Sequence, residues 1–190
     1  MPLMAMAALA NAGAIHASQP TTQPLKALES PAPTPSTIGP DFSAWRADGR
    51  SGTVRRRDAK IVHVTPVRGN ALSSTAGGAS SRWCGARLQT GASAAQSLLL
   101  VGVGVTEALS CDGIKAFGAV PAPRGVERIA FVYGGSSPNA TGVNTVVIIE
   151  LVSASTIWAV NEGLSYKLDQ LGTLTSVHAI RAYLAKHNRG

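Results

Sequence analysis

Runs of apolar and β-branched residues dominate the second half of this 190-residue chain and restrict the folds open to it. Four segments have the length and composition of β-strands, namely 97–105, 128–133, 145–152 and 156–160. A further run, 60–67, contains Pro66 and is typical of an edge strand. Only three residues separate the last two of the four segments, which favours an antiparallel hairpin between them.

The segment 128–133 shows how the predicted sheet divides its two faces. Side chains alternate along a strand, so Ile129, Phe131 and Tyr133 share one face while Ala130 and Val132 share the other. The second face carries only small side chains. We therefore expect a helix to pack on it.

Two helical patterns follow the strands. Asn161 can cap a helix with a stripe of three leucines that ends near Gly172, and residues 176–187 show a second apolar stripe with basic residues in the last turn. The segment 107–117 is ambiguous and fits a short helix. Strands followed by helices predict an α+β fold: a small antiparallel sheet of about four to five strands with two C-terminal helices packed on one face.

The N-terminal region has the composition of an export signal. Residues 1–17 are apolar and small, and cleavage after Ala14 or Ala17 would suit a signal peptidase. No Lys or Arg precedes Lys26, so an Ala-rich cytosolic tail is the alternative. Residues 18–57 are predicted as a linker, disordered and rich in Pro, Ser and Thr and then in Arg, and residues 58–190 as a single globular domain.

Two cysteines indicate the compartment. An even number of cysteines in an exported chain predicts one disulfide, between Cys84 and Cys111, formed in an oxidising environment. We therefore expect a periplasmic or secreted protein, with no transmembrane span once the signal peptide is removed. Its richness in Arg, Ala and Gly favours a bacterial source.

The chain is basic, with 17 Lys and Arg against 10 Asp and Glu and a net charge of +7. The segment from Arg46 to Arg57 ends in the densest cluster, Arg55, Arg56 and Arg57, which we take as a candidate anion-binding site. The alternative for this cluster is a solvated lead-in to the next strand. Nucleic acid is disfavoured as the partner because no aromatic residues are interleaved with these arginines.

A second candidate site is the polar segment 134–144 between two strong strands. Eleven residues exceed what a minimal hairpin needs, and long loops often carry recognition. Ser136, Ser137, Asn139 and Thr141 are the candidate partner-binding residues of this predicted loop.

Motifs for catalysis are missing from the sequence. The three histidines after the signal segment, His63, His178 and His187, are scattered, and no metal-ligand spacing, nucleophile motif or complete dinucleotide-binding motif occurs. We therefore predict no catalytic residue, no bound metal and no cofactor. Catalytic carboxylates distant in sequence leave no motif, so a hydrolase that uses Glu150, Glu127 or Asp112 stays as an alternative.

These observations favour an exported, non-enzymatic domain that binds another protein or a cell-envelope component, as an inhibitor, an immunity-type protein or an assembly accessory would. The first alternative is the exported hydrolase. The second is electrostatic binding of an anionic polymer through the segment from Arg46 to Arg57.

Overall fold

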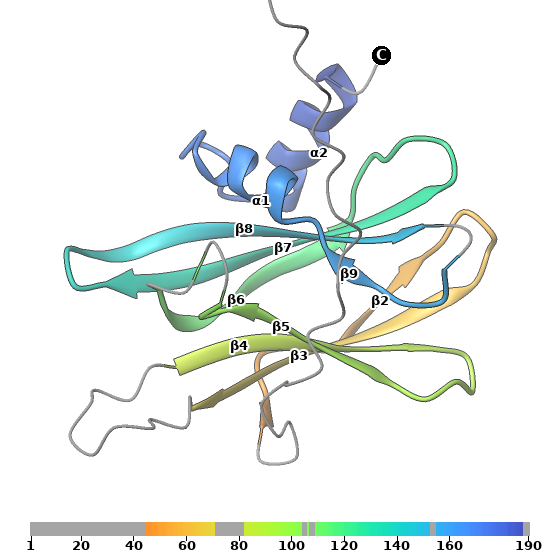
Figure 1. Ribbon diagram of the computed structural model, residues 1–190, viewed down its shortest axis with the longest axis horizontal. Coiled ribbons are helices and arrows are strands. Elements are labelled where there is room, and N and C mark those ends of the chain that lie inside the picture. Colours follow the sequence, from red (N-terminus) through yellow and green to blue (C-terminus); the bar gives the residue numbers. More distant parts are fainter. Residues whose placement is uncertain (1–44, 71–81, 104–105, 107–108, 153–154, 188–190) are drawn as a thin grey trace, which may run out of the picture. The chain divides into compact units, whose positions relative to one another are not determined.

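The chain forms two antiparallel β-sheets and two helices (Figure 1). The computed structural model describes residues 45–70, 82–103, 106, 109–152 and 155–187, all within one unit of the chain. The elements are β1 (Arg46–Ala47), β2 (Gly52–Arg55), β3 (Ile61–Asn70), β4 (Arg82–Thr90), β5 (Gln96–Val101), β6 (Ser110–Ala119), β7 (Val126–Ser137), β8 (Ala140–Val152), β9 (Ala159–Val160), α1 (Glu162–Asp169) and α2 (Val177–His187). The α+β class and the two C-terminal helices are confirmed.

The strands are divided between two sheets. The first sheet has five strands in the order β1-β3-β4-β5, with β2 also paired to β3, and the second has four in the order β6-β7-β8-β9. The predicted hairpin of β8 and β9 is antiparallel, with Ile149 opposite Val160. One sheet of about four to five strands was predicted, whereas the structure has two sheets, to which β1, β2, β4 and β6 contribute strands that the sequence did not predict.

The second sheet separates two hydrophobic cores. Ile129, Phe131 and Tyr133 of β7 belong to the core between the sheets, where they join Val62 and Val64 of β3. On the opposite face Ala130 and Val132 pack in a core with residues of both helices, including Leu168, Ile180 and Leu184. The predicted division of β7 into a large-residue face and a small-residue face under helices is thus confirmed.

Polar side chains attach α1 to β8. The Asn161 side chain caps α1 by accepting a hydrogen bond from the Leu164 N–H at 2.9 Å. Ser165 Oγ accepts from the Ile148 N–H at 2.9 Å, and Asp169 Oδ1 accepts from the Val146 N–H at 3.1 Å. Because β9 pairs only with the end of β8, these side chains provide acceptors that a longer strand would have supplied.

Neither helix in the described ranges has the length and apolar character needed to cross a membrane.

The predicted linker boundary at Arg57 is wrong, because residues 45–57 belong to the folded domain. Trp45 is only 7% exposed and packs against Gly69, where a Cβ would come within 2.7 Å of the indole ring. Val54 of β2 is buried between the sheets. These contacts join residues far apart in sequence, so local composition does not reveal them.

The strand around Pro66 is central rather than at the edge, which corrects a second prediction. β3 pairs with β4 on one side and with β1 and β2 on the other. The Pro66 carbonyl accepts a hydrogen bond from the Asp48 N–H at 2.8 Å, so the proline nitrogen also points toward this interrupted edge. The ladder between β3 and β4 therefore loses no donor.

Residues 110–119 form strand β6, not the short helix that 107–117 suggested; residues 107 and 108 lie outside the described ranges. The register of β6 against β7 shifts between Cys111 and Gly113 and again between Ile114 and Ala116. Each bulge inserts a residue and breaks the alternation of period two by which a strand is recognised.

The predicted loop 134–144 is mostly strand. β7 continues to Ser137 and β8 begins at Ala140, with Ser137 opposite Ala140, so only Pro138 and Asn139 form the turn. The glycines and serines that suggested a loop lie in the ladder itself. Gly134 is buried there, with the Lys115 side chain close to the position a Cβ would occupy.

We predict that Trp45→Ala lowers the free energy of unfolding by about 3 kcal/mol, because it removes a large buried side chain. Urea denaturation measures this change. Arg50→Ala is the matched control: Arg50 is exposed in the same segment, so the change should stay below about 0.5 kcal/mol. Equal unfolding midpoints for Trp45→Ala and the unsubstituted protein would restore the linker interpretation.

Candidate anion-binding site

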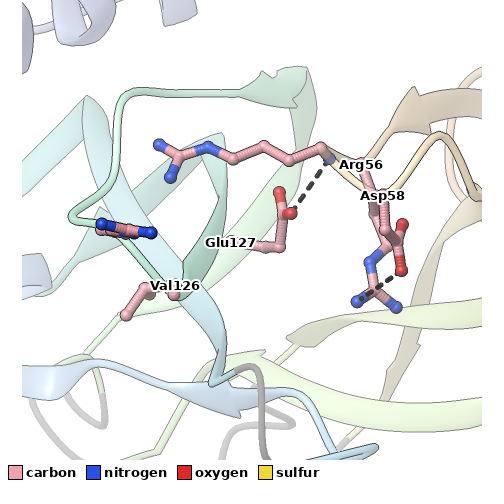
Figure 2. Close-up of a pocket in the computed structure, with 7 residues that line it drawn as sticks. Arg56, Asp58, Val126 and Glu127 are labelled. Carbon is pink, nitrogen blue, oxygen red and sulfur yellow. Dashed lines mark hydrogen bonds and ion pairs between the residues drawn. The ribbon is translucent and has the colours of Figure 1, made fainter.

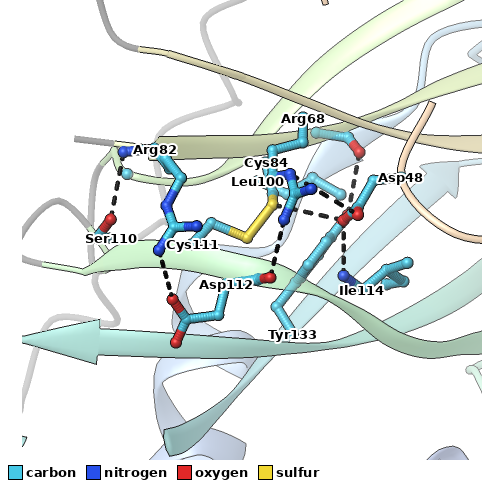
Figure 3. Close-up of a disulfide and its surroundings, with 12 residues drawn as sticks. Asp48, Arg68, Arg82, Cys84, Leu100, Ser110, Cys111, Asp112, Ile114 and Tyr133 are labelled. Carbon is cyan, nitrogen blue, oxygen red and sulfur yellow. Dashed lines mark hydrogen bonds and ion pairs between the residues drawn. A yellow bond between two sulfur atoms is a disulfide. The ribbon is translucent and has the colours of Figure 1, made fainter. Parts of the chain in front are cut away.

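A disulfide joins the two sheets beside the candidate site (Figure 3). Cys84 of β4 and Cys111 of β6 are bonded, with 5.8 Å between their Cα atoms, and both are fully buried. The predicted pairing is confirmed.

Asp48, in the connection between β1 and β2, links the sheets a second time. Its Oδ2 accepts a hydrogen bond from the Ile114 N–H at 2.7 Å, next to the bulges of β6 (Figure 3). Gly113 allows this approach: its φ is +135°, and a Cβ there would lie 3.3 Å from both carboxylate oxygens. The carboxylate thus satisfies a backbone donor beside the irregular pairing of β6.

Asp112 holds two arginines in place (Figure 3). Arg68 of β3 donates through Nη1 to the Asp112 carbonyl oxygen at 3.0 Å, and its Nε lies 3.9 Å from Asp48 Oδ1. Arg82 of β4 donates through Nη2 to Asp112 Oδ1 at 3.1 Å. Each guanidinium has five N–H donors, so both keep several free for another ligand.

These two arginines line a pocket of about 480 Å³ together with Arg46 of β1. We call it the arginine pocket; Ala47, Gly69 and Asn70 complete its lining. Arg46 is directly opposite Arg68 in the sheet, and within the described part of the chain its exposed side chain has no hydrogen-bond or ion-pair partner. Like charges in directly opposite positions repel, so an anion between them would be stabilising.

Arg57, a predicted anion-binding residue, instead ties the turn after β2 to the loop between β6 and β7. Its guanidinium donates to the carbonyl oxygens of Ala122 at 2.6 Å and Pro123 at 3.0 Å. Its backbone N–H donates to Glu127 Oε1 at 3.0 Å. These contacts give Arg57 a structural role.

The other two members of the triplet also differ in their surroundings. Arg56 is ion-paired to Asp58 at 3.2 Å (Figure 2), and its Nε is buried without a hydrogen-bond partner in the described structure. Arg55 is exposed. A second pocket of about 410 Å³, the turn pocket, is lined by Arg56, Arg57 and Arg124 together with the carboxylates of Asp58 and Glu127, whereas the lining of the arginine pocket contains no carboxylate. Its two carboxylates make it a weaker anion site than the arginine pocket.

One predicted partner-binding residue lies beside the arginine pocket. Ser136 donates through Oγ to Asp112 Oδ1 at 3.4 Å. Ser137 is half-buried at the end of β7, whereas Asn139 and Thr141 are exposed at the tip of the hairpin. The structure therefore associates Ser136, but not the whole set, with the arginines.

The carboxylates of the hydrolase alternative do not converge. Glu127 is opposite Leu151 and Glu150 is opposite Arg128, so the two glutamates point to different faces of the second sheet. Glu150 is ion-paired with Arg128. Asp112 lies near Gly135, eight residues along β7 from Glu127, or about 25 Å at the usual strand rise.

No group of three His, Cys, Asp or Glu side chains that could hold a metal ion occurs among the described residues.

Tyr133 lies next to the disulfide network and is fully buried. Its hydroxyl donates to the Gly85 carbonyl oxygen at 3.1 Å, which joins the second sheet to the first. Burial, and next the negative charge of Asp48, raise the pKa of Tyr133 well above its usual value. The phenol thus stays protonated and serves as a structural hydrogen-bond donor.

The chain matches no protein-family model, no curated protein and no solved structure.

Arg68 and Arg82 were missed as site residues, and Asp112 was named only as a carboxylate of the hydrolase alternative, although the sequence contained a signal that Arg82 and Asp112 lie together. Arg82 is two residues before Cys84, and Asp112 directly follows Cys111. A disulfide between these cysteines brings the two charges together. Arg46 belongs to the basic segment noted in the sequence, but its place beside Arg68 depends on the strand register, and Arg68 had no local signal.

We predict that the double variant Cys84→Ala, Cys111→Ala loses about 3.5 kcal/mol of unfolding free energy, because a loop spanning 27 residues is no longer closed in the unfolded chain. Urea denaturation with and without reductant measures the loss. Reductant should bring the unsubstituted protein close to the variant and leave the variant unchanged. Identical stabilities in oxidising buffer would contradict the prediction.

We predict that the unfolding free energy of the protein falls as pH rises above about 10, because Tyr133 ionises in the unfolded chain but not in the folded one. Tyr133→Phe should be less stable at neutral pH by about 1–3 kcal/mol, since Gly85 loses its donor. Its deficit should shrink with rising pH.

Urea denaturation at a series of pH values measures this difference. Tyr166→Phe is the control because Tyr166 is 55% exposed, and it should follow the unsubstituted protein throughout. Parallel pH curves for Tyr133→Phe and the unsubstituted protein would rule out a titrating Tyr133.

Proposed function

We propose that this protein is an exported, non-enzymatic domain that binds another protein or a component of the cell envelope, with the arginine pocket as its contact site. One observation carries the proposal: three arginines from three neighbouring strands line one pocket, and Asp112 fixes two of them. A pre-positioned set of donors lowers the entropy cost of ordering side chains on binding.

The arrangement of charged groups supports binding rather than catalysis. Acid–base chemistry needs two titratable groups within reach of one substrate. Glu127, Glu150 and Asp112 are each engaged in separate contacts and lie in different places on the second sheet. The hydrolase alternative therefore gains no support from them.

The disulfide supports export, since such bonds persist in the periplasm and outside the cell and are rare in the cytosol. The predicted signal peptide, residues 1–17, lies outside the described ranges.

A second candidate function is electrostatic binding of an anionic polymer along the edge of the first sheet. Arg46, Arg50 and Arg55 follow this edge and are exposed. In the described structure none of the three side chains has a hydrogen-bond or ion-pair partner. Such contacts would be distributed along the edge, with no single arginine decisive.

Charge reversal distinguishes the two functions. Cell envelopes and secreted proteins from the source organism are incubated with the purified protein, and binding is measured by co-sedimentation and by chemical cross-linking. We expect Arg46→Glu to weaken binding by about tenfold or more, because it reverses a charge in the pocket. Arg55→Glu, an equal charge change on the same edge, should leave binding nearly unchanged.

Equal weakening by the two substitutions would favour the polymer function and overturn the pocket as contact site. Tight binding that neither substitution alters would overturn both functions. Turnover of a substrate by the purified protein would overturn the non-enzymatic assignment.

A further inference from the structure

We infer that the arginine pocket binds a phosphate group, as a monoester or diester borne by its partner. This inference rests on the proposed function and specifies its ligand. Arg46, Arg68 and Arg82 stand on β1, β3 and β4, three strands that lie side by side in the first sheet. Their guanidinium groups thus reach the pocket from three backbone positions rather than one.

The number of donors favours phosphate over carboxylate. A carboxylate has two oxygens whose acceptor positions lie in one plane, so three guanidinium groups that approach from three strands cannot all bind it well. A tetrahedral phosphate presents oxygens in several directions and can accept from all three. Asn70, opposite Arg82 in the sheet, adds an amide to the lining.

The balance of charge also suits phosphate. Three guanidinium groups face two nearby carboxylates, Asp48 and Asp112, and both carboxylates already accept hydrogen bonds from the protein. One positive charge is left over, and the charge of a phosphodiester equals it. Binding would also relieve the repulsion between Arg46 and Arg68.

The turn pocket does not offer the same site. Arg57 in that pocket already donates two hydrogen bonds to backbone carbonyl oxygens, and Arg56 is ion-paired with Asp58. Arg124 lines that pocket as well, but Asp58 and Glu127 belong to the same lining and would repel a phosphate, whereas no carboxylate lines the arginine pocket. The comparison assigns the phosphate to the arginine pocket alone.

The experiment follows the arginine side chains directly. Inorganic phosphate is titrated into isotope-labelled protein while NMR records the Nε–Hε signals of the arginines at constant ionic strength. We expect saturable shifts for Arg46, Arg68 and Arg82 and none for Arg55. Acetate at the same concentrations should bind at least about tenfold more weakly.

Two variants with the same change in charge test the site. Arg46→Gln removes one pocket donor and should weaken phosphate binding by about tenfold. Arg55→Gln removes an exposed arginine outside the pocket and should change the affinity by less than about twofold. Neither side chain has a partner in the described structure, so both variants should fold.

A further arm identifies the source of the phosphate. Co-sedimentation with vesicles of phosphatidylglycerol in phosphatidylcholine, weakened by Arg46→Gln but not by Arg55→Gln, supports a lipid headgroup. Phosphate binding without vesicle binding supports a phosphate on a polymer or soluble partner.

Non-saturating shifts, equal weakening by both variants or tighter binding of acetate would overturn the phosphate inference. In that case the proposed function still stands if Arg46→Glu abolishes envelope or protein binding, because the pocket then takes a different anion. If phosphate binding fails and Arg46→Glu also leaves envelope and protein binding unchanged, the proposed function is overturned as well.

Discussion

The bond between Cys84 and Cys111 fixes how the two sheets meet at one end of the described domain. Cys84 is opposite Arg68 in the first sheet, and Cys111 directly precedes Asp112 in the second. The geometry that holds Arg68 and Arg82 therefore derives from a covalent link one or two residues away. Asp48 and Tyr133 reinforce the same junction with hydrogen bonds between the sheets. The same contacts therefore stabilise the fold and hold the candidate site in place.

Other polar links between the sheets lie away from this junction and do not form a comparable site. Arg57 ties the turn after β2 to carbonyl oxygens before β7. The Gln96 side-chain amide both donates to and accepts from the backbone of Trp158, which connects β5 to the chain entering β9. In these links the donors and acceptors satisfy one another. The lining of the arginine pocket contains three arginines and no carboxylate, which distinguishes it from these structural contacts.

Local patterns predicted those parts of the fold that depend on neighbours in sequence. The faces of β7, the helix cap at Asn161 and the disulfide all follow from short-range spacing or cysteine number. Trp45 was assigned to a linker because its burial depends on Gly69, and β6 was ambiguous because two bulges disturb its alternation. Of the candidate site, the triplet Arg55, Arg56 and Arg57 was visible as a charge cluster, but two of its members serve structural contacts. The arginines of the pocket come together only through strand register, which composition does not encode.

The interruption between β1 and β2 affects how the edge of the first sheet meets other protein chains. Because β1 and β2 pair with β3 only on either side of Thr65 and Pro66, this edge of the first sheet consists of two short strands joined by a connection that contacts Pro66 through Asp48. Another extended chain that approaches this edge meets two short strands instead of one long one, and positive charges at Arg46, Arg50 and Arg55. Both features oppose edge-to-edge association of sheets. This edge of the first sheet is therefore protected against pairing with other chains when the protein is concentrated.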